Sequence, residues 1–272
     1  NFALENNIPI IVILYSWDNL FSEDVNLKGT YYFVGSLEVG KILNKRHCIP
    51  NSKIFYFNSF QFSYLKKLKK IKKSREKYIL YSLCTEQESS IAKEEMEIIN
   101  GIGEILIKKK SNIKLYVRPY PFLYSKTKSK IKFKYPNIVV KEYGKQVLRR
   151  ENKKKKEYMR YEYNYDSKLS LLKNTICHIN FLSTIGIESV LLGRNTIFLN
   201  IKKKFNIFEP IKYLKSNYFK TKFLDHYKIF SKKNLFVTSF NELENNLSLI
   251  LENKNLRNKY RQEKFIKNFF LN

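Results

Sequence analysis

The chain has 272 residues, of which 43% are hydrophobic and 28% charged, so it can bury a sizeable core and general disorder is excluded. Its formal net charge is +28, carried by 43 Lys and only 9 Arg. Nucleic-acid sites favour Arg for bidentate contacts, and a chain rich in Lys and poor in Ala is typical of an A/T-biased genome. We therefore expect positive charge on all faces and no specific nucleic-acid partner. A functional basic surface would instead fit an anionic membrane, a phosphate-rich substrate or RNA.

Targeting signals are not evident in the sequence. No apolar run reaches the roughly 18 residues that a membrane-spanning helix needs, and the first residues lack the layout of a signal peptide. The chain begins with Asn1, and we expect it to start inside a larger protein. Cys48, Cys84 and Cys177 are far apart, which is typical of a reducing compartment. We predict a cytoplasmic protein, with a peripheral place at the inner membrane face as an open alternative.

The first segment, residues 1–64, contains three expected strands and one helix. The strands are predicted over Pro9–Tyr15, Thr30–Val34 and Lys53–Phe57, and the helix over Leu37–His47. This β-loop-β-α-β order is typical of the later part of a nucleotide-binding type of α/β domain.

A strongly basic stretch follows, over residues 65–77. Its core, Lys66–Lys77, consists mostly of Lys and has no Gly or Pro. We interpret it as an interdomain linker; a contact with a membrane surface or another polyanion is the alternative.

The second segment, residues 78–240, repeats the alternation of strand and helix. Strands are predicted over Tyr78–Leu83, Ile113–Arg118, Asn137–Lys141, Ile176–Phe181, Thr196–Asn200 and Leu235–Val237. A helix is predicted over Glu86–Asn100, stopped by Gly101 and Gly103; an extension over Ile102–Lys108 beyond a kink is the alternative. Further helices are predicted over Asp166–Asn174, over Ile187–Leu192, stopped by Gly193, and over most of a C-terminal helical segment, residues 241–272. The order predicts an α/β fold with a parallel sheet and helices on both faces.

Two tracts rich in Tyr and Lys do not join this alternation. They are Arg149–Tyr165 and Tyr213–Tyr227. We interpret them as surface loops and an edge helix; stacking on sugars or bases is the alternative.

The most informative stretch is Leu171–Asn200, where a strand leads through Ser183-Thr184 into a short helix that carries Gly186 and Glu188. Such a turn presents free backbone N–H groups and the positive end of the helix dipole, which together hold a phosphate. An ordinary helix cap is the alternative, since Ser or Thr at a helix start is common.

This stretch resembles the nucleotide-binding segment of GT-B-fold glycosyltransferases and their relatives, the nucleotide-sugar 2-epimerases and the CDP-glycerol glycerophosphotransferases. In these families a strand leads to a Ser/Thr turn, then an acid, then L-G-x-P. Here Leu192-Gly193-Arg194-Asn195 has Asn195 in place of that Pro. Leu14–Leu20 resembles a second segment, with Asp18 where the glycerophosphotransferases have a His. Val117–Pro121 resembles a third, with Tyr120 where they have another His.

The resemblance implies two Rossmann-like domains with parallel sheets, the N-terminal one truncated. A nucleotide-activated donor, either a nucleotide sugar or a CDP-polyol, would bind at the carboxyl ends of the strands. Ser183, Thr184 and Gly186 would hold its diphosphate, and Glu188 its ribose.

Three further residues complete the predicted site. Arg118 would offset charge on the leaving phosphate, and Thr85 ends a strand at the same rim. Asp18 would act as general base on the acceptor hydroxyl. Each also has a structural interpretation: a surface ion pair for Arg118, a helix cap for Thr85, and an Asx-turn with Asn19 for Asp18.

No cofactor or metal is predicted. The four aspartates are Asp18, Asp24, Asp166 and Asp225, so no D-x-D motif can hold a divalent cation. No P-loop or G-x-G-x-x-G follows a strand. His178 lies in an apolar strand and is interpreted as a satisfied core residue.

We therefore expect a metal-independent transferase that moves a glycosyl or polyol-phosphate group to a cell-surface glycan or lipid-linked acceptor. As a fragment, the chain is expected to lack activity without the rest of the cleft. A nucleotide-sugar 2-epimerase, a basic nucleic-acid-binding protein and an inactive relative are the alternatives.

Overall fold

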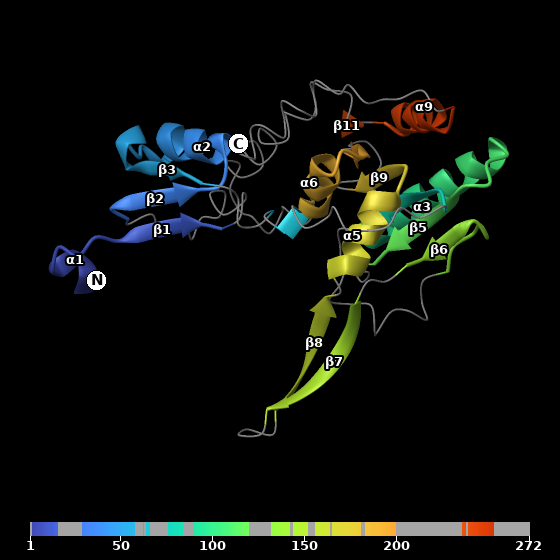
Figure 1. Ribbon diagram of the computed structural model, residues 1–272. Helices are drawn as coiled ribbons and strands as arrows, with labels where there is room; N and C mark the ends of the chain where they lie inside the picture. Colours follow the sequence, from blue (N-terminus) through green and yellow to red (C-terminus); the bar gives the residue numbers. More distant parts are fainter. Residues whose placement is uncertain are drawn as a thin grey trace. The chain divides into compact units, whose positions relative to one another are not determined.

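The computed structural model describes residues 2–15, 29–57, 62, 64–65, 76–83, 90–119, 132–141, 144–151, 156–163, 165–180, 183–199, 236–237 and 239–252. The chain divides into two compact units: unit 1 is Asn1–Lys69 with Thr221–Phe223 and Asn258–Asn272, and unit 2 is Lys70–Lys220 with Leu224–Arg257. The first boundary, between Lys69 and Lys70, lies inside the predicted basic linker. Figure 1 labels the elements of both units, and each unit is considered by itself.

Unit 1 is a small parallel α/β unit, as predicted. After α1 (Phe2–Glu5), its elements are β1 (Ile11–Leu14), β2 (Tyr31–Val34), α2 (Leu37–His47), η2 (Asn51–Lys53) and β3 (Ile54–Tyr56). The strands pair in parallel in the order β1-β2-β3. Helix α2 begins where the Ser36 hydroxyl accepts a hydrogen bond from the Val39 N–H at 3.2 Å. It ends at Cys48, which takes the left-handed conformation common at helix ends.

The two faces of this small sheet differ in exposure. Tyr32, Val34 and Ile54 are buried, and they alternate with side chains of the other face. On that other face Ile11 and Ile13 are 58% and 54% exposed. Unit 1 therefore has one packed face and one apolar face open to solvent.

Unit 2 contains a six-stranded sheet with the order β11-β10-β9-β4-β5-β6. Its strands are β4 (Tyr78–Ser82), β5 (Lys114–Arg118), β6 (Ile138–Val140), β9 (Cys177–Asn180), β10 (Asn195–Leu199) and β11 (Phe236–Val237). All five pairings between neighbours are parallel. The predicted α/β class with parallel sheets is confirmed.

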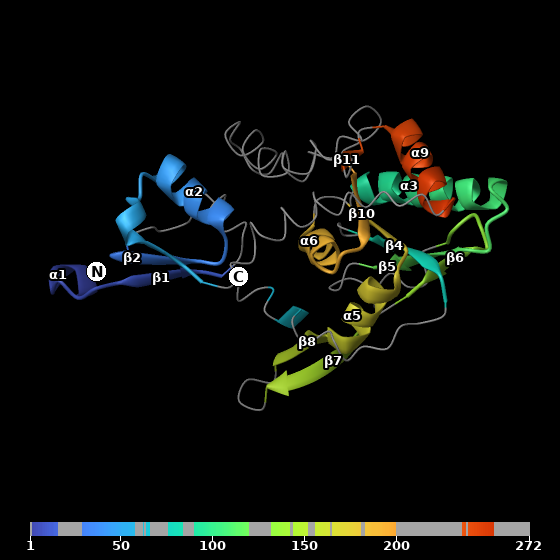
Figure 2. The ribbon, with the colours of Figure 1, turned by 45° about the horizontal axis from the view of Figure 1, so that its top comes forward.

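Helices cover both faces of this sheet. They are α3 (Ser90–Lys108), α5 (Tyr165–Asn174), α6 (Thr184–Leu191) and α9 (Phe240–Leu251). Figure 2 shows α3 and α9 on one side of the strands and α5 and α6 on the other. Helix α6 begins three residues earlier than predicted and ends before Gly193, whose φ of +66° favours glycine.

Helix α3 runs through Gly101 and Gly103 to Lys108, so the predicted stop is wrong and the alternative, an extension over Ile102–Lys108, is confirmed. Both glycines mark close packing. A Cβ at Gly101 would lie 2.5 Å from the Phe240 ring, and one at Gly103 would lie 2.7 Å from Ile138. The glycines allow neighbouring elements to approach the helix, and the buried contacts outweigh their low helix propensity.

The tract Arg149–Tyr165 is neither a surface loop nor an edge helix. Most of it belongs to an antiparallel hairpin of β7 (Gly144–Glu151) and β8 (Lys156–Tyr163). In both views the hairpin extends away from the six-stranded sheet of unit 2. The tract Tyr213–Tyr227, most of Lys66–Lys77 and residues 253–272 lie outside the described residues.

Candidate functional site

The candidate site lies in unit 2, at the carboxyl end of the sheet on the face covered by α5 and α6. Three strands end there on polar residues in one row, since Ser82 of β4 pairs with Arg118 of β5 and with Asn180 of β9. Ser82 and Asn180 are fully buried and Arg118 is 8% exposed. Buried polar groups placed together at this edge are the usual mark of a ligand site in a parallel α/β sheet.

The turn from β9 into α6 is held by a side chain that sequence reasoning missed. The Asn180 Oδ1 accepts hydrogen bonds from both the backbone N–H and the hydroxyl of Ser183, each at 3.2 Å. Ser183 is the N-cap of α6, yet its side chain makes no capping hydrogen bond. The ordinary-cap interpretation of the Ser183 hydroxyl is therefore wrong. The sequence signal for Asn180 was a polar residue at the end of an apolar strand, just before the Ser-Thr turn.

Gly186 is needed for the packing of α6 on the sheet. A Cβ at this position would lie 2.5 Å from Asn180 Oδ1 and 2.5 Å from the Phe198 ring. Gly186 therefore allows side chains of β9 and β10 to pack closely against α6. Any part that Gly186 plays toward a ligand stays a prediction, as do the ligand contacts predicted for Ser183 and Thr184.

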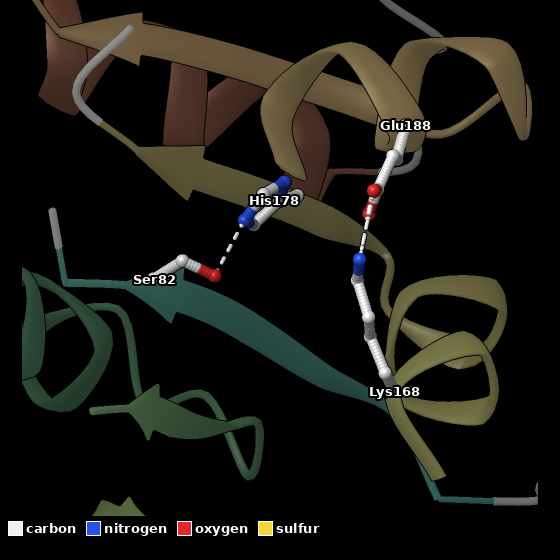
Figure 3. Close-up of polar contacts among 4 residues, drawn as sticks. All are labelled: Ser82, Lys168, His178 and Glu188. Atoms are coloured by element: carbon white, nitrogen blue, oxygen red, sulfur yellow. Dashed lines mark hydrogen bonds and ion pairs between the residues drawn. The ribbon is translucent and has the colours of Figure 1, made fainter. Parts of the chain in front are cut away.

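Glu188 forms an ion pair that the sequence did not reveal. The Lys168 Nζ of α5 lies 2.7 Å from Glu188 Oε1 and 2.6 Å from Oε2, with side-chain exposures of 12% and 5% (Figure 3). Burial lowers the pKa of Lys168, and the Glu188 carboxylate opposes that shift. The predicted ribose contact of Glu188 would therefore involve a carboxylate already oriented by Lys168.

A second buried polar contact joins β9 to β4. His178 Nε2 lies 2.9 Å from the Ser82 hydroxyl, and both residues are fully buried (Figure 3). Burial, together with the positive charges of Arg118 and Lys168, lowers the pKa of His178 to about 3. The imidazole is therefore neutral near pH 7. Its Nδ1 has no hydrogen-bond partner among the described residues, so the interpretation as a satisfied core residue holds for one ring nitrogen only.

The cluster is basic. Arg118 acts electrostatically on both Lys168 and His178, so these side chains share one region of the structure. Two cations and one carboxylate, together with neutral hydroxyl, amide and imidazole groups, suit a ligand that combines phosphate with hydroxyl groups.

Two predicted site residues cannot be placed. Asp18 and Thr85 lie outside the described residues. Within the described ranges no group of three His, Cys, Asp or Glu side chains gathers as a metal site would require. Within the same ranges no helix is both long and apolar enough to cross a bilayer.

Comparisons with known proteins give a match for the fold. No protein-family model matches the chain, and no curated protein sequence does. Among solved structures, the complex of S. aureus MnaA with UDP matches with a TM-score of 0.56 at 11% identity, covering 98% of this chain and 65% of that chain. The Methanocaldococcus jannaschii UDP-GlcNAc 2-epimerase in complex with UDP-GlcNAc and UDP matches with a TM-score of 0.50 at 17% identity, covering 88% of this chain and 60% of that chain.

The wall teichoic acid polymerase TagF matches less well. Its TM-score is 0.48 at 13% identity, covering 89% of this chain and 54% of that chain. The chain therefore spans between about half and two thirds of the length of these structures. The resemblance noted in the sequence is confirmed at the level of the fold: this chain has the GT-B-like architecture of two Rossmann-like units with parallel sheets.

Proposed function

We propose that this protein is an enzyme that binds a nucleoside-diphosphate-activated donor at the carboxyl edge of the unit 2 sheet. The observation that carries the proposal is the row of Ser82, Arg118 and Asn180 at the ends of three strands. Helix α6 begins at Ser183-Thr184, three residues after Asn180. A helix N-terminus beside a buried guanidinium favours a phosphate group. The nucleotide ligands of the MnaA complex and of the M. jannaschii epimerase complex support this choice of ligand class.

Each residue then has a role in the proposed complex. Ser183, Thr184 and the first N–H groups of α6 hold the diphosphate, and Gly186 keeps that helix close to the strand. Arg118 offsets the charge that develops on the leaving phosphate. Glu188 accepts hydrogen bonds from the ribose hydroxyls. Because Lys168 holds the Glu188 carboxylate at 2.7 Å, little side-chain entropy is lost when a ribose binds.

The proposed reaction is transfer of a glycosyl or polyol-phosphate group to a surface glycan or a lipid-linked acceptor, without a metal or cofactor. Asp18 is the proposed general base, and Thr85 is proposed to line the rim of the donor site. Asp18→Asn is expected to lower turnover with little change in donor affinity, since a base acts in the transition state.

The second candidate is 2-epimerisation of a nucleotide sugar, and the fold likeness to the M. jannaschii epimerase favours it. The two reactions differ in their need for an acceptor. A transferase releases its nucleotide only when an acceptor glycan is present: a nucleoside diphosphate after glycosyl transfer, or a nucleoside monophosphate after polyol-phosphate transfer. An epimerase changes the configuration of the sugar without one, and this change is visible by proton NMR.

Glu188→Gln tests the nucleotide site directly. Loss of a charge-assisted hydrogen bond costs about 1.5–3 kcal/mol, so affinity for UDP or CDP should fall roughly tenfold to a hundredfold. Calorimetric titration measures this, and circular dichroism checks the fold. Glu104→Gln is the matched control, because Glu104 forms an exposed i,i+4 pair with Lys108 on α3. Unchanged affinity in Glu188→Gln, alongside a measurable wild-type signal, would remove Glu188 from the site.

A further inference from the structure

Two buried polar atoms of β9 are left without a hydrogen bond. They are Nδ1 of His178 and Nδ2 of Asn180, and neither has a partner among the described residues. Both residues are fully buried. A buried donor or acceptor without a partner costs free energy, so native structures pair such atoms with protein groups or with an ordered water. These two atoms therefore point to a further occupant of the α5/α6 face.

The two atoms belong to neighbouring side chains on one face of the strand. His178 and Asn180 are two residues apart, so their side chains leave β9 on the same side, about 6.6 Å from each other. The imidazole leans toward Asn180, because its Nε2 lies 2.9 Å from the hydroxyl of Ser82, the β4 residue that pairs with Asn180 (Figure 3). One water molecule that makes two hydrogen bonds of about 2.9 Å spans a gap of this size.

The hydrogen-bonding character of the two atoms is complementary to water. Asn180 Oδ1 accepts hydrogen bonds from the N–H and the hydroxyl of Ser183, which assigns the other amide atom as the NH2 donor. At Nδ1 of His178 a bare lone pair is less costly than an orphaned buried N–H. The ring proton is therefore assigned to Nε2, which donates to Ser82. The two atoms thus offer one donor and one acceptor.

We propose that one buried water joins Nδ1 of His178 to Nδ2 of Asn180, and that His178 is thereby a positioning residue for the start of α6. The water donates to Nδ1 and accepts from Nδ2, which holds the Asn180 amide in the orientation that presents Oδ1 to Ser183. Hydrogen bonds then connect β4, through the imidazole, the water and the amide, to the Ser183 turn. The water site does not depend on the proposed function, but its effect on nucleotide binding rests on it.

The same two atoms argue against other occupants. A metal cation would be repelled by the NH2 protons of Asn180 and by the positive charges of Arg118 and Lys168, which act on the imidazole. An anion would be repelled by the lone pair of Nδ1. A hydroxyl of a bound nucleotide would have to enter a place where both residues are fully buried. A trapped neutral water meets all of these conditions.

Nitrogen NMR of the full chain tests the water site. In protein labelled with nitrogen-15 histidine, the His178 signal is identified by its absence in His178→Gln. At pH 7 it should show a protonated Nε2 and an unprotonated Nδ1 with the shift of a hydrogen-bonded lone pair, and the ring Hε1 should show cross-relaxation with a long-lived water. A protonated Nδ1, or an unprotonated Nδ1 with the shift of a free lone pair, would overturn the proposal.

The positioning role needs a variant of its own. His178→Phe keeps a ring and removes both nitrogens, so hydrogen exchange of the Ser183 backbone N–H, which donates to Asn180, should become about threefold to tenfold faster. The matched control is Thr196→Val. It removes a buried hydroxyl that donates to Ser189, on the strand beside His178, and should leave that exchange rate unchanged. Thermal unfolding checks the fold of each variant. Equal exchange rates in the two variants would overturn the proposal.

Calorimetric titration with UDP connects the water to the nucleotide site. The affinity should fall about threefold to tenfold in His178→Phe and stay the same in Thr196→Val. An unchanged affinity in His178→Phe, alongside a measurable wild-type signal, would overturn the positioning role. A wild type that binds no UDP would instead contradict the proposed function, and the NMR and exchange measurements would still decide between water and no water.

Discussion

The two faces of the unit 2 sheet are built from the same strands but differ in the polarity of the side chains that they bury. On the side of α3 and α9, the core is hydrophobic along the whole length of the strands, from Ile79 and Leu115 to Leu83 and Leu199. On the side of α5 and α6, a small apolar cluster around Tyr78, Leu80 and Tyr116 gives way to polar residues at the carboxyl end. One face stabilises the unit, and the other accepts buried polar groups.

The comparison teaches where polar burial is tolerated. Several buried polar residues of the α5/α6 face are paired with a residue of another element, such as Ser82 with His178 and Lys168 with Glu188. Such groups cost free energy unless they are paired. Their concentration at one end of one face therefore indicates a ligand site. If the two faces are independent, changes in the α3/α9 face should alter stability without altering ligand affinity.

Lys168→Met should have the largest effect on stability. It leaves the Glu188 carboxylate buried without its cation, which costs about 3–5 kcal/mol in the free energy of unfolding. Urea unfolding measures the loss, and adding Glu188→Gln to the same chain should recover part of it. Lys173→Met, on the same helix, is the control. Equal losses in the two Met variants would show that the Lys168–Glu188 pair contributes little.

Leu106→Ala should follow, with a loss of about 3 kcal/mol. Leu106 is fully buried in the α3/α9 face, where truncation leaves a cavity. Because this face contributes nothing to the proposed site, the affinity for UDP should stay the same below the unfolding temperature. A parallel fall in UDP affinity, measured by calorimetry, would mean that the two faces are coupled.

The pH dependence of stability should reveal His178. Its pKa is about 3 in the folded state against 6.5 for the free side chain, so the unfolded chain takes up the proton first as the pH falls. The stabilisation is complete above pH 6.5 and is lost progressively toward pH 3. Between pH 6.5 and 5 the wild type should lose about 2 kcal/mol that His178→Gln does not lose. His47→Gln is the control, and an identical slope in His178→Gln would contradict the assignment.

Two glycines give the smallest and most selective test, one on each face. A Cβ at Gly101 would meet the Phe240 ring, and one at Gly186 would meet Asn180 and Phe198, each at 2.5 Å. Crowding exceeds the gain in helix propensity, so each change to Ala should cost about 1 kcal/mol. Only Gly186→Ala should also lower UDP affinity, since Asn180 positions the Ser183 turn. Similar UDP affinities in both variants would show that the Ser183 turn does not contribute to nucleotide binding.

Much of the fold could be predicted because it rests on local signals. The apolar strands β4, β5 and β9 and the helix α5 lie close to their predicted ranges. The helix stop at Gly193 follows from its positive φ. The glycines inside α3 misled the prediction, because their reason is a neighbour that lies far away in the sequence. Residues 144–163 were misjudged since their Lys and Tyr content hid an alternation that only strand pairing makes visible.

The sequence by itself determined the parallel α/β class and the position of the Ser183-Thr184 turn after a strand, because hydrophobic periodicity and chain order are local properties. Only the tertiary structure decided which side chains meet there. His178 and Ser82 are 96 residues apart, and Lys168 and Glu188 are 20 apart on different helices. Such pairs form because parallel strands bring their carboxyl ends to one edge, and that juxtaposition depends on strand order, which the local pattern of residues does not encode.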